Sequence, residues 1–112
     1  MDLQSETRND IQFITVDDTR IDAAAAIGFK DSMRELTDGG ADHVVLDLTN
    51  VTFVDSSGLG AIVAAMKNMG VRRQLDLAGL TPDVDKVFRL TRMDSVFVIH
   101  ASAADAALRA AV

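Results

Sequence analysis

A nearly continuous apolar segment, His-Val-Val-Leu-Asp-Leu at residues 43–48, lies near the middle of the chain. A strand that alternates apolar and polar residues has one dry face, whereas an almost uninterrupted apolar strand is covered on both faces. Segments with helical spacing precede and follow this one, so helices are available to cover it. The segment therefore predicts a central strand in a mostly parallel sheet, with helices packed against the sheet.

The first part of the chain predicts two strands and a helix. Residues 11–16 are β-branched and aromatic, and residues 3–7 form a weaker candidate for an antiparallel partner at the sheet edge. Asp22 is the expected cap of the helix, which ends at the glycines at positions 39 and 40. The apolar face of this helix consists of Ala25, Phe29, Met33 and Leu36.

The second half of the chain repeats the alternation of strands and helices. A second helical stripe ends at Gly70 and carries Leu59, Ile62, Val63, Met66 and Met69. A strand is expected at Leu75 and Leu77, followed by a helix that Thr81 and Pro82 open and that turns Val84, Val87 and Phe88 inward. The last expected elements are a strand at residues 96–99 and a short helix with a capping box at Ser102 and Asp105.

These elements together predict one α/β domain over residues 1–112. We expect a mostly parallel central sheet of about five strands with an antiparallel edge, and about four helices. No low-complexity linker interrupts the chain, and its hydrophobic residues, 48% of the total, are enough to form a core.

Composition excludes several classes of function. A formal net charge of −6 opposes binding to nucleic acid, and the absence of cysteine excludes disulfides, thiolate metal sites and cysteine nucleophiles. The sequence predicts neither a metal site nor a cofactor. No apolar stretch approaches the roughly 20 residues that cross a bilayer, and the acidic start does not resemble a secretory signal, so we expect a cytoplasmic protein without membrane insertion.

The segment with unusual chemistry is Asp-Ser-Ser-Gly-Leu-Gly at residues 55–60, after an apolar strand and at the start of a helix. A serine at such a position lies in an accessible loop, where another protein can reach its hydroxyl group. We expect Ser57 to cap the helix, with Ser56 as the alternative cap. A phosphate here would meet free amides and the positive end of the helix dipole, so the domain would stay folded.

This motif and the apolar strand before it resemble the STAS domain, and specifically the bacterial anti-sigma factor antagonists. The resemblance covers nearly the whole chain and implies the STAS fold. It also implies that a partner kinase phosphorylates Ser56. One departure is the Thr-Arg-Ile-Asp turn at residues 19–22, where the family often has Gly-x-Leu-Asp and where only Asp22 is retained.

The resemblance implies a binding protein with no catalytic residue of its own. Its partner would be an anti-sigma factor with serine kinase activity, which the unphosphorylated protein binds and thereby releases the sigma factor. Phosphorylation of Ser56 would abolish binding, and a metal-dependent serine phosphatase would restore it. Asp55 would present the serine or, as the favoured alternative, shape the contact surface.

The expected contact surface surrounds Ser56 and follows a face of small residues along the helix, where a partner backbone can come close. It comprises Asp22, Asp55, Ser56, Ser57, Gly58, Leu59, Gly60, Ala61, Ala65 and Asn68.

The residue pattern also allows other interpretations. Ser56 and Ser57 could serve only the helix start, or the chain could be a STAS subunit of a lipid-transport ATPase or of another signalling assembly. A serine hydrolase is disfavoured because the Gly-x-Ser-x-Gly elbow is absent. His43 and His100 are expected to be structural or surface residues, and Asp47 to bind nearby loop amides.

Overall fold

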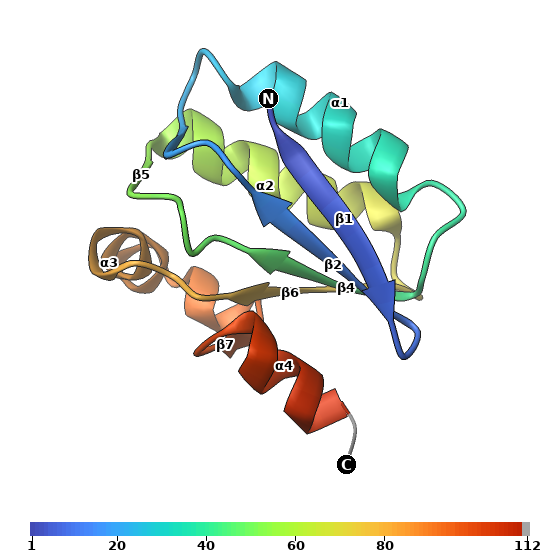
Figure 1. Cartoon of the computed structure of the whole chain (residues 1–112). Coiled ribbons are helices and arrows are strands. Elements are labelled where there is room, and N and C mark those ends of the chain that lie inside the picture. Colours follow the sequence, from blue (N-terminus) through green and yellow to red (C-terminus); the bar gives the residue numbers. More distant parts are fainter. Residues whose placement is uncertain (111–112) are drawn as a thin grey trace.

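The computed structural model describes residues 1–110 as alternating strands and helices (Figure 1). Residues 111 and 112, which the predicted domain includes, lie outside the described residues. The strands are β1 (Leu3–Arg8), β2 (Ile11–Val16), β3 (Arg20–Ile21), β4 (His43–Asp47), β5 (Phe53–Val54), β6 (Gln74–Ala78) and β7 (Ile99–His100). The helices are α1 (Ala26–Thr37), α2 (Ser56–Met69), α3 (Pro82–Leu90), the short 3-10 helix η1 (Met93–Ser95) and α4 (Ala103–Ala110).

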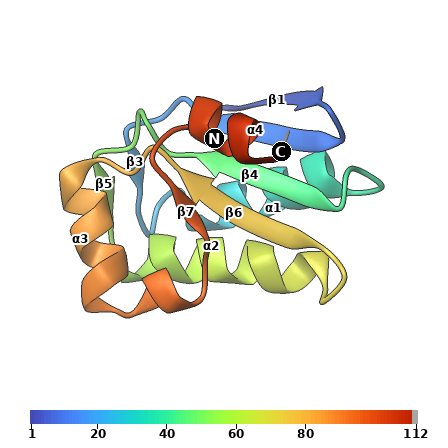
Figure 2. The same ribbon diagram turned by 90° about the horizontal axis from the view of Figure 1, so that it is seen from below.

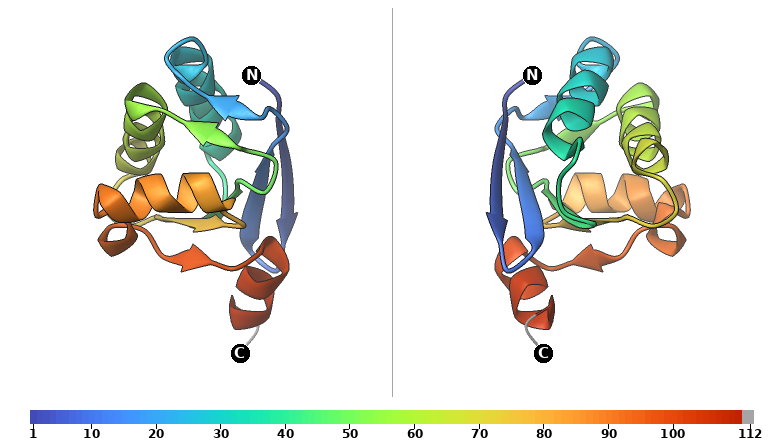
Figure 3. Two further views of the ribbon diagram at one scale, coloured as in Figure 1. Left: turned by 90° about the vertical axis from the view of Figure 1, so that its left-hand side faces the viewer. Right: turned by 90° about the vertical axis from the view of Figure 1, so that its right-hand side faces the viewer.

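The main sheet has five strands in the order β1-β2-β4-β6-β7. Strands β1 and β2 pair antiparallel, and every other neighbouring pair in this sheet is parallel. The predicted mixed sheet with an antiparallel edge is therefore confirmed. A separate parallel pair, β3 and β5, lies at one end of the molecule and leads into α1 and α2 (Figure 3).

The central strand is covered on both faces, as its composition predicted. Val44, Val45 and Leu46 of β4 are all 0% exposed. Val44 and Leu46 pack in the larger core with α1, α2 and α3, whereas Val45 packs in a smaller core with α4. Figure 2 shows α4 on the face of the sheet opposite to α1 and α2.

The predicted cap of α1 is wrong, whereas the N-cap residue predicted for α3 is right in position but makes no cap hydrogen bond with its side chain. Helix α1 has Ala25 at its N-cap without a side-chain hydrogen bond, because Asp22 closes a turn before the helix by accepting from the Ala25 amide at 3.1 Å. Thr81 occupies the N-cap position of α3, but its hydroxyl instead donates to the Val51 carbonyl at 2.7 Å. By contrast, Ser102 Oγ accepts from the Asp105 amide at the start of α4, as predicted.

The last strand is shorter and later than predicted. Helix η1 ends at Ser95, and the backbone of the next residue, Val96, is still helical, so the chain pairs with β6 over Ile99–His100 only. Val96 and Val98 are exposed, while Phe97 between them is buried in the core. No helix among residues 1–110 is both long and apolar enough to span a bilayer.

Candidate functional site

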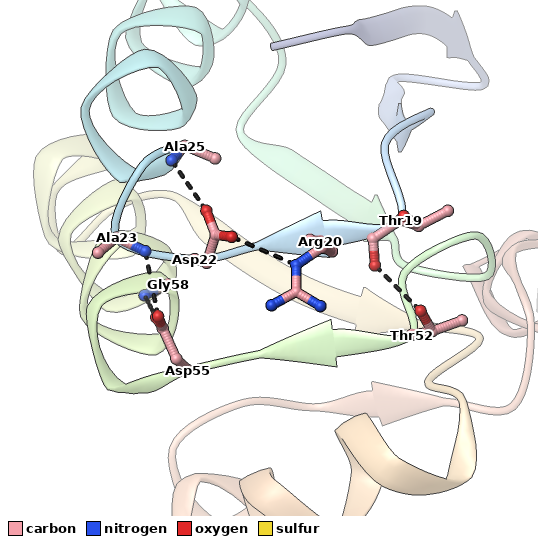
Figure 4. A network of polar contacts seen from close by, with 8 residues as sticks. All are labelled: Thr19, Arg20, Asp22, Ala23, Ala25, Thr52, Asp55 and Gly58. Atoms are coloured by element: carbon pink, nitrogen blue, oxygen red, sulfur yellow. Dashed lines mark hydrogen bonds and ion pairs between the residues drawn. The ribbon is translucent and has the colours of Figure 1, made fainter.

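Strand β5 leads directly into the start of α2, where Asp55 is the N-cap residue. Its Oδ1 accepts a hydrogen bond from the amide of Gly58 at 2.8 Å, and its Oδ2 accepts one from the amide of Ala23 at 3.1 Å (Figure 4). Asp55 therefore caps α2 and also ties this helix to the segment that precedes α1.

The prediction that Ser57 or Ser56 caps the helix is wrong, since Asp55 does so. The sequence contained the signal, because aspartate is as good an N-cap as serine and the amide three positions later is the usual donor. The two serines are instead the first two helical residues, and both are exposed.

Ser56 shares its end of the helix with amides that the helix itself does not use. The first four N–H groups of an α-helix have no intrahelical partner. Here the Gly58 amide donates to the Asp55 side chain, and the Asp55 amide donates to the Ile21 carbonyl at 3.4 Å. The amides of Ser56 and Ser57 thus lie next to an exposed hydroxyl group at the positive end of α2.

Gly58 allows α2 to approach strand β3 very closely. A Cβ atom at this position would collide with the backbone carbonyl of Ile21, which is itself fully buried. The glycine of the motif is therefore required for packing between backbones, and it is buried rather than available to a partner.

The small residues further along α2 are buried as well, contrary to the expected open face. Ala61 and Ala65 are 2% and 6% exposed and belong to the larger hydrophobic core, and α1 packs beside α2 (Figure 3). Gly58, Ala61 and Ala65 are thus not available as contact residues. Ser56, Ser57, Gly60 and Asn68 are exposed, and Leu59 is half-buried.

The β3–β5 pair adds residues that sequence reasoning did not place in the site. The Arg20 guanidinium lies over the Phe53 ring, 4.0 Å from its centroid, and these two residues are register partners. Phe53 is 39% exposed, so a large apolar ring lies at the surface three residues before Ser56. In both Arg20-Ile21 and Phe53-Val54 an exposed residue precedes a buried one, and this shared pattern was the signal in the sequence that the two segments pair.

Asp22 joins the same network from the other side. Its Oδ2 accepts from Arg20 Nε at 3.3 Å, and its Oδ1 accepts from the Ala25 amide. Partial desolvation acts in the opposite direction, but the Ala25 hydrogen bond and the Arg20 charge lower the pKa of Asp22 below its ordinary value. A hollow of about 380 Å³ beside Asp22 is lined in part by Asp18, Arg20 and Gly28.

The structure therefore brings Asp22, Asp55, Ser56 and Ser57 together, with Arg20 and Phe53 beside them. Asn68 does not belong to this group. It lies in the last turn of α2, about 18 Å along the helix axis from Ser56 at 1.5 Å per residue.

Residues 2–106 match the family model of the STAS domain. The chain belongs to the STAS domain family. It is 31% identical over 81 residues to the STAS-domain containing protein PA14_20770 of Pseudomonas aeruginosa, a match that covers 71% of this chain and 79% of that protein. It is also 36% identical over 55 residues to the anti-sigma-B factor antagonist of Listeria monocytogenes, covering 48% of each chain.

Solved structures share the STAS fold over essentially the whole chain. An anti-sigma-factor antagonist (STAS) domain protein from Planctomyces limnophilus superimposes with a TM-score of 0.89 at 19% identity, and the match covers 100% of both chains. The Bacillus cell fate determinant SpoIIAA in its phosphorylated form gives a TM-score of 0.71 at 20% identity, covering 97% of this chain and 99% of that chain.

The remaining polar candidates have structural roles in this STAS domain. Nε2 atoms of His43 and His100 both lie within hydrogen-bonding distance of Asp76 Oδ2, at 2.8 and 2.9 Å. Asp47 Oδ1 accepts from the amide of Thr49, as predicted. In the described part of the chain, no group of three or more histidine, aspartate or glutamate side chains is placed to hold a metal ion.

Proposed function

We propose that this STAS domain is an anti-sigma factor antagonist controlled by phosphorylation of Ser56. The unphosphorylated form binds an anti-sigma factor that has serine kinase activity, and this binding releases the sigma factor. The observation that carries the proposal is the exposed Ser56 hydroxyl at the first residue of α2, next to a capped and tightly packed helix start.

The helix start can accept a phosphate without unfolding. Phosphorylation adds about −1.5 to −2 charge at this position. The free amides of Ser56 and Ser57 and the positive end of the helix dipole favour that charge. The Asp55 side chain does not occupy the amides of Ser56 and Ser57, because its two oxygens accept hydrogen bonds from the amides of Gly58 and Ala23.

The effect of the phosphate is therefore expected at the contact surface. Exposed Phe53 and Gly60 and half-buried Leu59 supply apolar contact area around Ser56, and the hollow beside Asp22 can receive a partner side chain. A partner that fits a neutral hydroxyl group at Ser56 loses that fit when a bulky, hydrated anion replaces it.

The chain acts as ligand and as substrate in this cycle, while the partners supply the catalysis. The kinase transfers the γ-phosphoryl group of ATP to Ser56 Oγ. A new O–P bond forms, the bond between the γ-phosphorus and the ADP oxygen breaks, and a base on the kinase takes the hydroxyl proton. A metal-dependent phosphatase then hydrolyses the phosphoester with water, which returns the serine and releases inorganic phosphate.

The arrangement of the histidines argues against a serine hydrolase. Both histidines of the chain hydrogen-bond to Asp76 across β4, β6 and β7. Neither hydrogen-bonds to Ser56, so the base that a serine nucleophile requires is not in place.

Capture of partners from the native cell, followed by phosphorylation, tests the proposal. Tagged protein is expected to capture an ATP-binding serine kinase, and ATP is expected to release the complex and leave phosphate on Ser56. Ser56→Ala keeps binding and blocks release, whereas Ser57→Ala, the matched control in the same turn, is still phosphorylated and released. Capture of a transporter ATPase, or phosphate consistently on another residue, would contradict the proposal.

A further inference from the structure

A second surface feature lies away from Ser56, between α1 and the C-terminal half of α2. The two helices pack side by side on one face of the sheet (Figure 3). A hollow of about 450 Å³ lies between them. Its lining residues are Lys30, Arg34, Ala64, Ala65, Lys67 and Asn68. We call this hollow the basic groove.

The charge of the basic groove is opposite to that of the chain as a whole. Three of its lining residues are cations and none is an acid, although the formal net charge of the protein is −6. Other arginines pair with carboxylates, as Arg20 does with Asp22 and Arg89 with Asp85. Within residues 1–110, no salt bridge involves Lys30, Arg34 or Lys67.

The helix dipole explains only part of this arrangement. Arg34 and Lys67 lie in the last turns of α1 and α2, where a cation stabilises the negative end of a helix. Lys30 lies in the first half of α1, beyond the reach of that effect, and it is half-buried. The dipole also does not account for the convergence of all three side chains on one hollow.

We infer that the basic groove is a docking site for an acidic segment of a protein partner. Lys30 and Arg34 are four residues apart, so they lie about 6 Å apart along the axis of α1. Acidic residues at alternate positions of an extended segment are separated by about 6.6 Å, which matches this spacing. Lys67 flanks the segment from α2, and half-buried Ala64 gives the groove a small apolar wall.

A protein segment suits the basic groove better than other anions do. A nucleic acid long enough to bind strongly would extend beyond the groove onto an acidic surface, which repels it. A small anion bound at a helix is favoured by the free amides of its N-terminus, whereas the groove is formed by the sides of two helices, whose amides bond within each helix. The inference does not depend on phosphorylation of Ser56.

Titration of the full chain with a defined peptide tests this inference by nuclear magnetic resonance. The probe is the end-blocked hexapeptide Ala-Glu-Ala-Glu-Ala-Glu at low ionic strength, and its glutamine counterpart is the uncharged control. The glutamate peptide is expected to shift the amide signals of Lys30, Arg34, Ala64 and Lys67. The glutamine peptide is expected to leave them unchanged.

Charge-matched variants separate local recognition from the effect of total charge. Arg34→Glu with Lys67→Glu reverses two groove cations, whereas Arg72→Glu with Lys86→Glu reverses two exposed cations elsewhere. Both variants change the net charge equally. The groove variant is expected to weaken peptide binding about tenfold, from the loss of two ion pairs, and the control variant by less than about twofold. Circular dichroism checks that both variants are folded.

Three outcomes would overturn the inference. The first is an absence of shifts in the groove, or equal shifts with the glutamine peptide. The second is equal weakening in the two variants, which would indicate a general charge effect. The third is displacement of the peptide by inorganic phosphate or an eight-residue oligothymidylate at lower concentration than the peptide itself, which would assign the groove to a different class of anion.

Discussion

Helices α1 and α2 begin side by side, but their N-termini are held very differently. At α2, Asp55 caps the helix, accepts a second amide from the neighbouring segment, and is followed by a glycine in backbone contact with Ile21. At α1, Ala25 offers no side-chain cap, and Asp22 closes a turn three residues earlier. The exposed Ser56 therefore lies at the more firmly fixed of the two helix starts. Its hydroxyl group can be modified without a change in the position of the backbone.

The largest expected effect comes from breaking the backbone contact at α2. Gly58→Ala places a methyl group against the Ile21 carbonyl, which cannot rotate away, and we expect the free energy of unfolding to fall by about 3 kcal/mol. Urea denaturation monitored by circular dichroism measures this change.

Gly60→Ala is the matched control, because a Cβ there meets nothing within 4 Å. In an exposed helical position this change is expected to stabilise by about 0.5–1 kcal/mol. Equal effects of the two substitutions would show that close packing does not distinguish the start of α2.

Removal of the cap is the next largest change. Asp55→Ala leaves the amides of Gly58 and Ala23 without their partner, and we expect a loss of about 1–2 kcal/mol in the free energy of unfolding. Ser57→Ala, the control two residues later, is expected to change it by no more than about 0.5 kcal/mol. A larger loss in the free energy of unfolding of the Ser57 variant would indicate that Ser57 caps the helix.

The turn before α1 is expected to matter less and to depend on pH. Asp22→Ala should destabilise the protein less than Asp55→Ala, because Asp22 is partly solvated and closes a turn rather than a helix end. The lowered pKa of Asp22 means that its contribution is present above the unfolded value of about 3.9 and is lost as the pH falls through the folded value.

Urea midpoints of the wild-type protein and the Asp22→Ala variant should therefore differ at about pH 7 and converge at low pH. A difference that grows as the pH falls would have the wrong sign for a stabilising carboxylate and would contradict this assignment.

The smallest effect on stability is expected at Ser56 itself. Because its side chain does not cap α2, Ser56→Ala should change the free energy of unfolding by less than about 0.5 kcal/mol, as at an ordinary surface position. Differential scanning calorimetry measures this change. A loss of 1–2 kcal/mol, of the size of a missing cap, would mean that the serine does hold the helix.

The sequence predicted most of the architecture, because hydrophobic period reports which faces are buried. The run from Val44 to Leu46 predicted a strand with two covered faces, and all three residues are fully buried. The period also predicted α2 up to Gly70, whereas the edge strand β1 has a poor pattern and was only a weaker candidate.

The sequence was less informative where adjacent residues are equally suited to the same structural role. Asp55, Ser56 and Ser57 are all good N-caps, and the choice among them depends on where the helix backbone meets Ile21 and Ala23. Ala61 and Ala65 illustrate the same limit, because a small residue suits either an open surface or a close contact between helices.

The sequence by itself determined that this chain forms an α/β domain with an accessible serine beside an aspartate, since apolar period and local backbone preferences act over a few residues. Only the tertiary structure decided which residue caps α2, which small residues are buried, and that Lys30, Arg34 and Lys67 line one groove. Those outcomes depend on contacts between segments distant in sequence, and no local pattern encodes which two helix faces will meet.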